Sequence, residues 1–214
     1  MTELVCSRLC HDIISPVGAI SNGLELMSEF GNSKDADAMA LVVSSAHQAV
    51  AKLSFFRMAY GQAGTRQTGM SFDEAANMLE PVVASPRVTL DWPTEQRPQS
   101  PLPAPGTIKL CLNLGLLAVE ALPRGGTLRV TVTPQDNRIL FSILAAAPDA
   151  RLTDEFVGAL TGTVAIRDLT PRTAQGALTR YLAERLGTKV TMSSNEGNGP
   201  AAGVAFEVSI PVAE

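Results

Sequence analysis

One stretch near the start of the chain decides the fold: Arg8-Leu9-Cys10-His11-Asp12-Ile13-Ile14-Ser15-Pro16-Val17-Gly18-Ala19-Ile20. Its apolar residues recur at steps of three and four, which predicts one face of an amphipathic helix. His11 lies off that face and is followed by a carboxylate. A neutral imidazole on an exposed helix face beside a carboxylate can act as a nucleophile toward phosphorus. Pro16 cannot donate a hydrogen bond to the carbonyl of Asp12, so we expect a local bulge or kink one turn after the histidine.

The same periodicity extends outward into two long helices, over residues 3–30 and 34–63. Gly31-Asn32 is a typical helix stop, and Ser33 or Asp35 can cap the second helix. The apolar face of the first helix comprises Val5, Leu9, Ile13, Pro16, Ile20, Leu24 and Met27. That of the second comprises Met39, Val42 or Val43, Ala46, Val50, Leu53, Phe56 and Tyr60. Two long helices joined by a short turn pack antiparallel, and a lone hairpin leaves half of each face uncovered, which favours a homodimer forming a four-helix bundle.

The remainder of the chain has a mixed pattern. Residues 61–68 have no periodicity and resemble a linker, so we expect domains over residues 1–66 and 70–214. Helices are expected near residues 72–84, 107–121, 153–160 and 173–186, and strands near 87–92, 127–133, 138–145, 189–193 and 204–210. Helices on one face of a mixed sheet form a two-layer α/β sandwich, so the fold class is α+β.

Composition excludes several functions. The formal net charge is −4, and no basic stripe is available to bind nucleic acid. No uncharged apolar stretch approaches the roughly 18–20 residues that span a bilayer, so we expect a cytoplasmic protein without membrane contact. The three cysteines, Cys6, Cys10 and Cys111, do not form a disulfide framework. Cys10 and His11 diverge on a helix, and no second ligand pair follows, so we expect no metal site.

His11 and Asp12 are the candidate catalytic residues. Asp12 could hold the imidazole through its Nδ1–H and make the other nitrogen more nucleophilic. It could equally be a surface carboxylate favoured by the dipole near a helix N-terminus.

Four further residues are candidates for binding a partner: Ser15, Gly18, Asn22 and Arg57. The first three follow His11 at helical spacing and form a small, polar face that would allow another protein to approach closely. Arg57 lies opposite the level of His11 if the hairpin turns near residue 32, and a guanidinium there could meet a phosphoryl group or an acidic surface. A solvated helix face and an ordinary surface arginine are the alternatives.

The segment His11-Asp12-Ile13-Ile14-Ser15-Pro16 resembles the phosphorylation box of two-component histidine kinases, with Ile14 in place of the usual arginine. Leu112-Asn113-Leu114, followed by Pro123 and Gly125-Gly126-Thr127, is similar to the asparagine-box helix and next strand of those kinases. The segment from Ser193 to Pro211 resembles their closing hairpin. This resemblance implies a dimerisation hairpin followed by an ATPase-like domain.

The departures from the kinase pattern concern nucleotide binding. Leu117 stands where those kinases have a second asparagine for Mg²⁺, and residues 145–151 lack the glycine turn for adenine and phosphates. Residues 174–178, at the position of the lid, keep a single glycine. Without glycines the backbone amides cannot approach phosphates closely. We therefore expect this chain to bind no ATP and no cofactor of its own.

With its histidine retained and its nucleotide motifs lost, the chain resembles the ChpT-type histidine phosphotransferases of bacterial cell-cycle phosphorelays. The match is most specific over residues 8–26 and 55–61. It implies that His11 accepts phosphate from an aspartate on the receiver domain of a hybrid histidine kinase and donates it to response regulators, with Mg²⁺ supplied by the receiver. A divergent ATP-dependent cytosolic histidine kinase and a non-enzymatic protein that docks receivers remain open.

Overall fold

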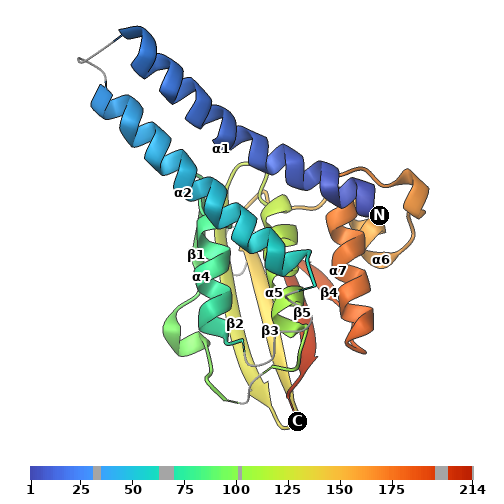
Figure 1. Cartoon of the computed structure of the whole chain (residues 1–214). Coiled ribbons are helices and arrows are strands. Elements are labelled where there is room, and N and C mark those ends of the chain that lie inside the picture. Colours follow the sequence, from blue (N-terminus) through green and yellow to red (C-terminus); the bar gives the residue numbers. More distant parts are fainter. Residues whose placement is uncertain (31–34, 63–69, 101–102, 196–201, 214) are drawn as a thin grey trace.

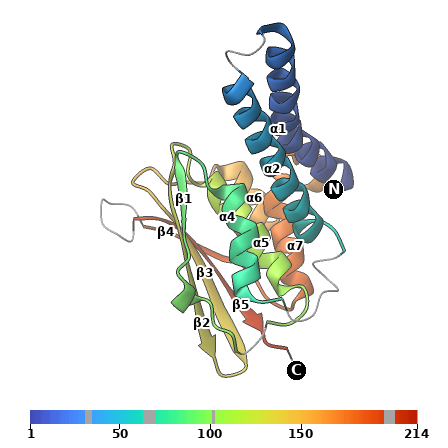
Figure 2. The same ribbon diagram turned by 60° about the vertical axis from the view of Figure 1, so that its left-hand side comes forward.

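The computed structural model describes residues 1–30, 35–62, 70–100, 103–195 and 202–213. Two long antiparallel helices, α1 (Thr2–Phe30) and α2 (Asp35–Ala59), form the predicted hairpin at the N-terminus (Figure 1). Helix α1 stays helical through Pro16, and Figure 2 shows it changing direction part-way along its length. The predicted helix stop at Gly31-Asn32 and the cap at Ser33 lie outside the described residues, as does most of the predicted linker.

Small side chains form the seam between the two helices. A Cβ on Gly23 of α1 would lie 2.6 Å from Cγ2 of Val42, so the two backbones approach closely there. The buried face of α2 continues with Ala38, Ser45 and Ala49, at helical spacing.

The predicted apolar face of α2 is only partly covered in the single chain. Four of its members are exposed: Met39, Val43, Val50 and Leu53. Phe56 is buried as predicted. Val42, which was the predicted alternative to Val43, faces the seam between the two helices. The large side chains do not fit where the backbones approach closely, so they occupy the adjacent, solvent-facing side of α2. On α1, Leu24 is exposed in the same way.

The second part of the chain is the predicted two-layer sandwich. Its five-stranded sheet has the order β1 (Val88–Asp91), β2 (Gly126–Gln135), β3 (Arg138–Ala146), β5 (Gly203–Pro211), β4 (Thr191–Asn195). The β1–β2 pair is parallel and the other pairs are antiparallel. Four helices cover one face: α4 (Phe72–Val83), α5 (Thr107–Glu120), α6 (Asp154–Thr161) and α7 (Ala174–Arg185) (Figure 2). The α+β fold class is confirmed.

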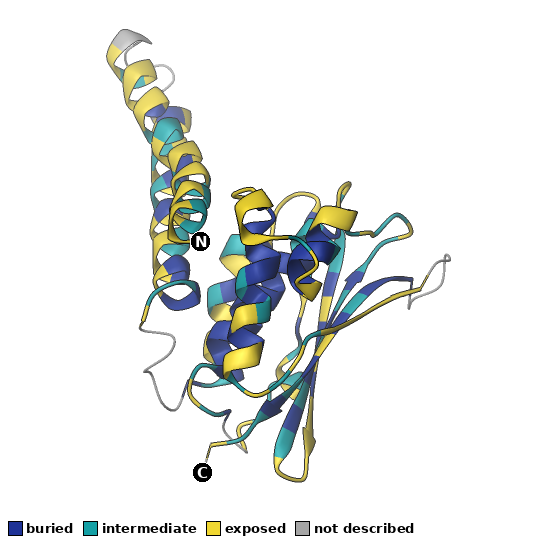
Figure 3. Cartoon of the chain, turned by 90° about the vertical axis from the view of Figure 1, so that its right-hand side faces the viewer, coloured by how far each residue is buried: buried dark blue, intermediate teal, exposed yellow. Residues whose placement is uncertain are grey.

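Helix α5 is the central element of the molecule. It packs against the sheet, against α4 and α7, and against α2 of the hairpin. Its side chains Leu110, Leu114 and Leu117 are fully buried, as are Phe141 and Phe206 on the sheet. Figure 3 shows the buried residues concentrated in α5 and on the face of the sheet beneath it. One helix thus supports the sheet on one side and the hairpin on the other.

One helix among the described residues, over Ala36–Ala59, is long and apolar enough to cross a membrane by length and composition alone, with a mean hydropathy of 1.2. In this structure the same segment is the second helix of the hairpin, and it packs against α1, α4 and α5.

Candidate functional site

His11 projects from α1 beside the sandwich. Its side chain is 87% exposed, and its Nδ1 lies 3.2 Å from Oδ1 of Asp12. When Nδ1 carries the proton and donates it to the carboxylate, Nε2 is the unprotonated, nucleophilic nitrogen. The structure therefore brings the two predicted catalytic residues together, although they are adjacent on a helix.

Arg8 connects this pair to the sandwich, a role that was not predicted from the sequence. Its Nε lies 3.8 Å from Oδ2 of Asp12, and one of its terminal nitrogens donates to Oε1 of Glu120 on α5 at 2.9 Å. Its other terminal nitrogen donates to the carbonyl of Arg172 at 3.0 Å. The guanidinium of Arg172 pairs in turn with Glu120 at 2.7 Å. The one available signal was the position of Arg8, four residues before Asp12 on the same helix face.

A pocket of about 400 Å³ lies at this junction. It is lined by Ser7, Arg8, His11, Asp12, Glu120, Thr170, Pro171 and Arg172. The histidine is thus open to solvent on one side and bordered by the sandwich on the other.

Lys52 of α2 stabilises the backbone at the same level. Because Pro16 has no N–H, the carbonyl of Asp12 loses its helical partner. The ammonium of Lys52 donates to that carbonyl at 3.0 Å. The proline is therefore accommodated by a hydrogen bond from the neighbouring helix.

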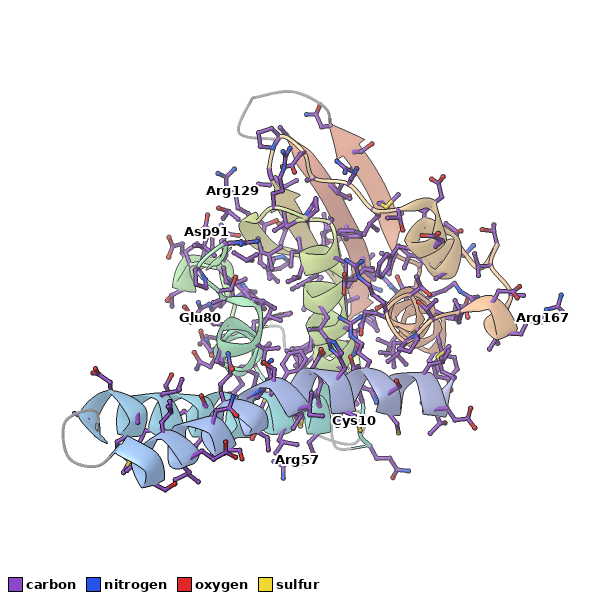
Figure 4. All side chains as sticks on the ribbon, turned by 90° about the horizontal axis from the view of Figure 1, so that it is seen from above. Cys10, Arg57, Glu80, Asp91, Arg129 and Arg167 are labelled. Atoms are coloured by element: carbon purple, nitrogen blue, oxygen red, sulfur yellow. The ribbon has the colours of Figure 1, made fainter. Side chains whose placement is uncertain are left out.

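The predicted partner-binding residues divide into two groups. Ser15 and Asn22 are exposed, and a Cβ built on Gly18 would meet nothing within 4 Å, so this face is open. Arg57 is not brought to His11. It lines a separate pocket of about 540 Å³ with Cys6, Leu53 and other, mainly apolar residues, and it projects from the side of the hairpin facing away from the sandwich (Figure 4). On α2, the residue that lies opposite His11 is Lys52, rather than Arg57.

The residues that resemble a kinase nucleotide site are engaged in other contacts. The Asn113 side-chain amide donates to the carbonyls of Ala59 and Lys109, each at 2.8 Å. Leu117 is fully buried in the core. Gly176, the glycine retained at the lid position, packs against α6, where a Cβ would lie 3.2 Å from the Cβ of Ala159. Within the described residues, no group of three or more histidine, cysteine, aspartate and glutamate side chains is placed to hold a metal ion.

Comparison with known proteins shows the family to which this chain belongs. A family model for the histidine phosphotransferase C-terminal domain matches residues 72–198. The chain is also 37% identical over 189 residues to the protein phosphotransferase ChpT of Brucella abortus (strain 2308), covering 88% of each chain. The chain belongs to the ChpT-type histidine phosphotransferase family.

Solved structures extend the comparison to the fold. A bacterial phosphotransferase solved at 1.7 Å is 32% identical, with a TM-score of 0.76 over 97% of this chain and 94% of that one. The mycobacterial sensor histidine kinase MprB is a more distant match, 15% identical with a TM-score of 0.45 over 67% of this chain and 95% of that one. A phosphotransfer role follows from membership of the ChpT-type family.

Proposed function

We propose that this protein carries phosphoryl groups between two receiver domains through His11. The observation that carries the proposal is the exposed imidazole whose Nδ1 lies 3.2 Å from the Asp12 carboxylate. Nε2 attacks the phosphorus of an aspartyl phosphate, the bond from phosphorus to the carboxylate oxygen breaks, and the aspartate leaves as a carboxylate. The second receiver reverses these steps, and its aspartate takes the phosphoryl group from Nε2.

Phosphoryl transfer has a loose transition state, so catalysis consists chiefly of alignment and charge neutralisation. This chain aligns the imidazole through Asp12, which Arg8 holds in turn. The receiver supplies the phosphorylated aspartate and its Mg²⁺. The open face formed by Ser15, Gly18 and Asn22 leaves room for the receiver to approach the histidine.

We also propose that the chain binds no ATP. Leu117 offers no oxygen ligand, and the side-chain oxygen of Asn113 already accepts a hydrogen bond from the amide nitrogen of Gln175. Further parts of the proposal are a cytoplasmic homodimer, a role in bacterial cell-cycle signalling, and two kinds of partner: the receiver domain of a hybrid histidine kinase and response regulators.

The His11→Ala variant tests the relay. Incubated with a phosphorylated receiver, the wild-type protein should gain an acid-labile label and pass it to a second receiver, whereas the variant should do neither. Asp12→Ala should retain the label but transfer it about tenfold or more slowly, because the imidazole loses its orienting partner. Full transfer through the His11 variant would contradict the proposal.

Two controls separate the alternative functions. Calorimetry should show receiver binding by both variants near the wild-type affinity, because two side chains rarely carry a whole interface. A protein that only docks receivers would support the downstream response equally well with either substitution. Labelled ATP with Mg²⁺ should leave the wild-type protein unlabelled, and stoichiometric labelling of His11 without a partner would instead indicate a kinase.

A further inference from the structure

One face of α5 carries polar side chains that all contact the hairpin. Lys109, Asn113 and Glu120 follow one another at steps of four and seven, so they share a helix face. All three belong to a helix whose other side chains are almost entirely buried. Burying a polar group is costly unless it is hydrogen-bonded.

Lys109 and Asn113 bind the C-terminal end of α2. The last carbonyls of a helix have no partner within the helix. Asn113 donates to the carbonyl of Ala59 at 2.8 Å, and the ammonium of Lys109 donates to those of Tyr60 and Gly61 at 3.2 and 2.8 Å. The sandwich thus provides the C-terminal cap of a hairpin helix. Helix α2 ends at Ala59, four residues before the predicted end, and these donors lie at its last carbonyls.

Gln175 of α7 completes the same network. Its amide nitrogen donates to Oδ1 of Asn113 at 2.9 Å, and its carbonyl oxygen accepts from the hydroxyl of Tyr60 at 2.9 Å. Asn113 is fully buried and Gln175 is 2% exposed. Three elements, α2, α5 and α7, are therefore joined by a buried set of hydrogen bonds that spans both parts of the molecule.

The ion pair of Arg8 with Glu120 lies at the opposite end of α5. A helix of 14 residues is about 20 Å long, so α5 is attached to α2 near its start and to α1 at its end. A single attachment would permit rotation about that point, whereas attachments at two places along α5 restrict the rotation of the sandwich relative to the hairpin. His11 lies one turn from Arg8, beside the second attachment.

We propose that Lys109, Asn113 and Gln175 are positioning residues, which lock the sandwich to the end of α2 so that receivers meet His11 and the bordering sandwich surface in one fixed arrangement. This inference rests on the proposed function. The lock acts on docking and leaves the chemistry of the imidazole unchanged, because none of the three side chains touches His11 in this structure.

Two apolar substitutions and one conservative substitution test the lock in the full-length protein. Asn113→Leu and Lys109→Met remove the donors, whereas Lys109→Arg keeps a cation that can reach both carbonyls. Ser209→Ala is the matched control, because it removes one hydrogen bond, from Nε of Arg138, inside the sandwich and away from the hairpin. Gln175→Met is a second variant should Asn113→Leu fail to fold, because it removes the donor to Oδ1 of Asn113 at nearly constant side-chain volume.

Three measurements are made on each variant: amide hydrogen exchange at residues 55–61, labelling of His11 by phosphoramidate, and the KM and kcat for a receiver domain phosphorylated with acetyl phosphate. In the apolar variants we expect exchange about tenfold faster. We also expect unchanged phosphoramidate labelling and a receiver KM raised about threefold or more at constant kcat. Lys109→Arg and Ser209→Ala should behave as wild type.

Unchanged hydrogen exchange in both apolar variants would overturn the lock. Faster exchange with an unchanged receiver KM would overturn its positioning role. A loss of phosphoramidate labelling would show that the substitutions disturb the histidine itself, which also contradicts the proposal. Failure of the wild-type protein to accept phosphate from any receiver would instead overturn the proposed function, and hydrogen exchange would still decide whether the lock exists.

Discussion

At the scale of single residues, Asp12 makes three contacts, each of which fixes a different part of the site. One carboxylate oxygen faces Nδ1 of His11, the other faces Arg8, and the backbone carbonyl accepts from Lys52. The pairing with the histidine could be predicted from adjacency and residue type. The contacts of Arg8 could not, because Glu120 and the carbonyl of Arg172 lie 112 and 164 positions away and become neighbours only when the sandwich packs on the hairpin.

Tyr60 offers a test of burial at this scale. Burial, the largest cause, raises the pKa of its hydroxyl from 10.0 to about 12. The unfolded chain therefore loses this proton first as the pH rises above 10, so ionisation favours unfolding. Between pH 10 and 12 we expect the free energy of unfolding to fall by on the order of 2 kcal/mol from this group.

The Tyr181→Phe variant contains Tyr60 as its single tyrosine, since the chain has two. Its phenolate absorbance in the near ultraviolet should rise with a midpoint near pH 12. A midpoint near pH 10 in the folded variant would contradict the burial of this hydroxyl. Urea unfolding of Tyr60→Phe over the same pH range should lack the alkaline loss assigned to Tyr60.

At the scale of elements, a hydrogen bond missing within α1 of the hairpin is replaced by one from α2. Pro16 leaves one carbonyl of α1 without a partner, and Lys52 of α2 provides one. Lys52→Met should lower the free energy of unfolding by about 1–3 kcal/mol, because that carbonyl then lacks its donor. Pro16→Ala restores an N–H four residues after Asp12. The double variant should therefore recover most of the loss.

Urea denaturation of the wild type, both single variants and the double variant measures this coupling directly. Strictly additive changes would show that Lys52 acts in some other way. Lys52→Arg is the control, because it retains a donor and should stay close to the wild type.

The periodicity of apolar residues predicted which helices and strands form. It was less informative about which face of α2 packs against α1. The apolar residues of α2 occupy two adjacent faces, and hydrophobicity alone favours the one with larger side chains. The face with small side chains packs against α1 instead, because Gly23 has no side chain and allows the two backbones to approach closely. That choice depends on the partner helix, so the pattern of α2 alone could not reveal it.

At the scale of the whole molecule, the hairpin exposes many large hydrophobic side chains. It presents large hydrophobic side chains from both helices: Ile14, Val17, Leu24, Met39, Val43, Val50 and Leu53. Figure 3 shows exposed residues along most of the hairpin, which extends beyond the sandwich. Each such side chain gains about 1–3 kcal/mol on burial, which favours pairing with a second copy.

Light scattering at micromolar concentration should therefore give twice the chain mass of 22.5 kDa. The double variant Val17→Glu, Val50→Glu should be monomeric, because burying two carboxylates in that interface is strongly unfavourable. Thr131→Glu, on the exposed face of the sheet, should remain dimeric. A monomeric wild-type protein would contradict the four-helix bundle.

The two-layer architecture also followed from the sequence, since turn residues separate the predicted strands and helices clearly. The position of the sandwich relative to the hairpin could not be predicted from the sequence. It depends on buried polar pairs such as Asn113 with Ala59, in which one partner is a backbone carbonyl that is present at every residue. No pattern in the sequence indicates to which backbone carbonyl a side chain donates its hydrogen bond.

The placement of His11 has a kinetic consequence. In the proposed relay, each chain offers one nucleophilic nitrogen, on His11, which is open on one side and bordered by the sandwich on the other. On that proposal, donor and acceptor receivers occupy the same place in turn, and we expect the donor to leave before the acceptor arrives. We expect a substituted-enzyme, or ping-pong, rate law, with parallel lines in double-reciprocal plots and competitive inhibition of the acceptor by excess dephosphorylated donor. The steady-state flux through the relay would then depend on the ratio of the two receivers as well as on their amounts.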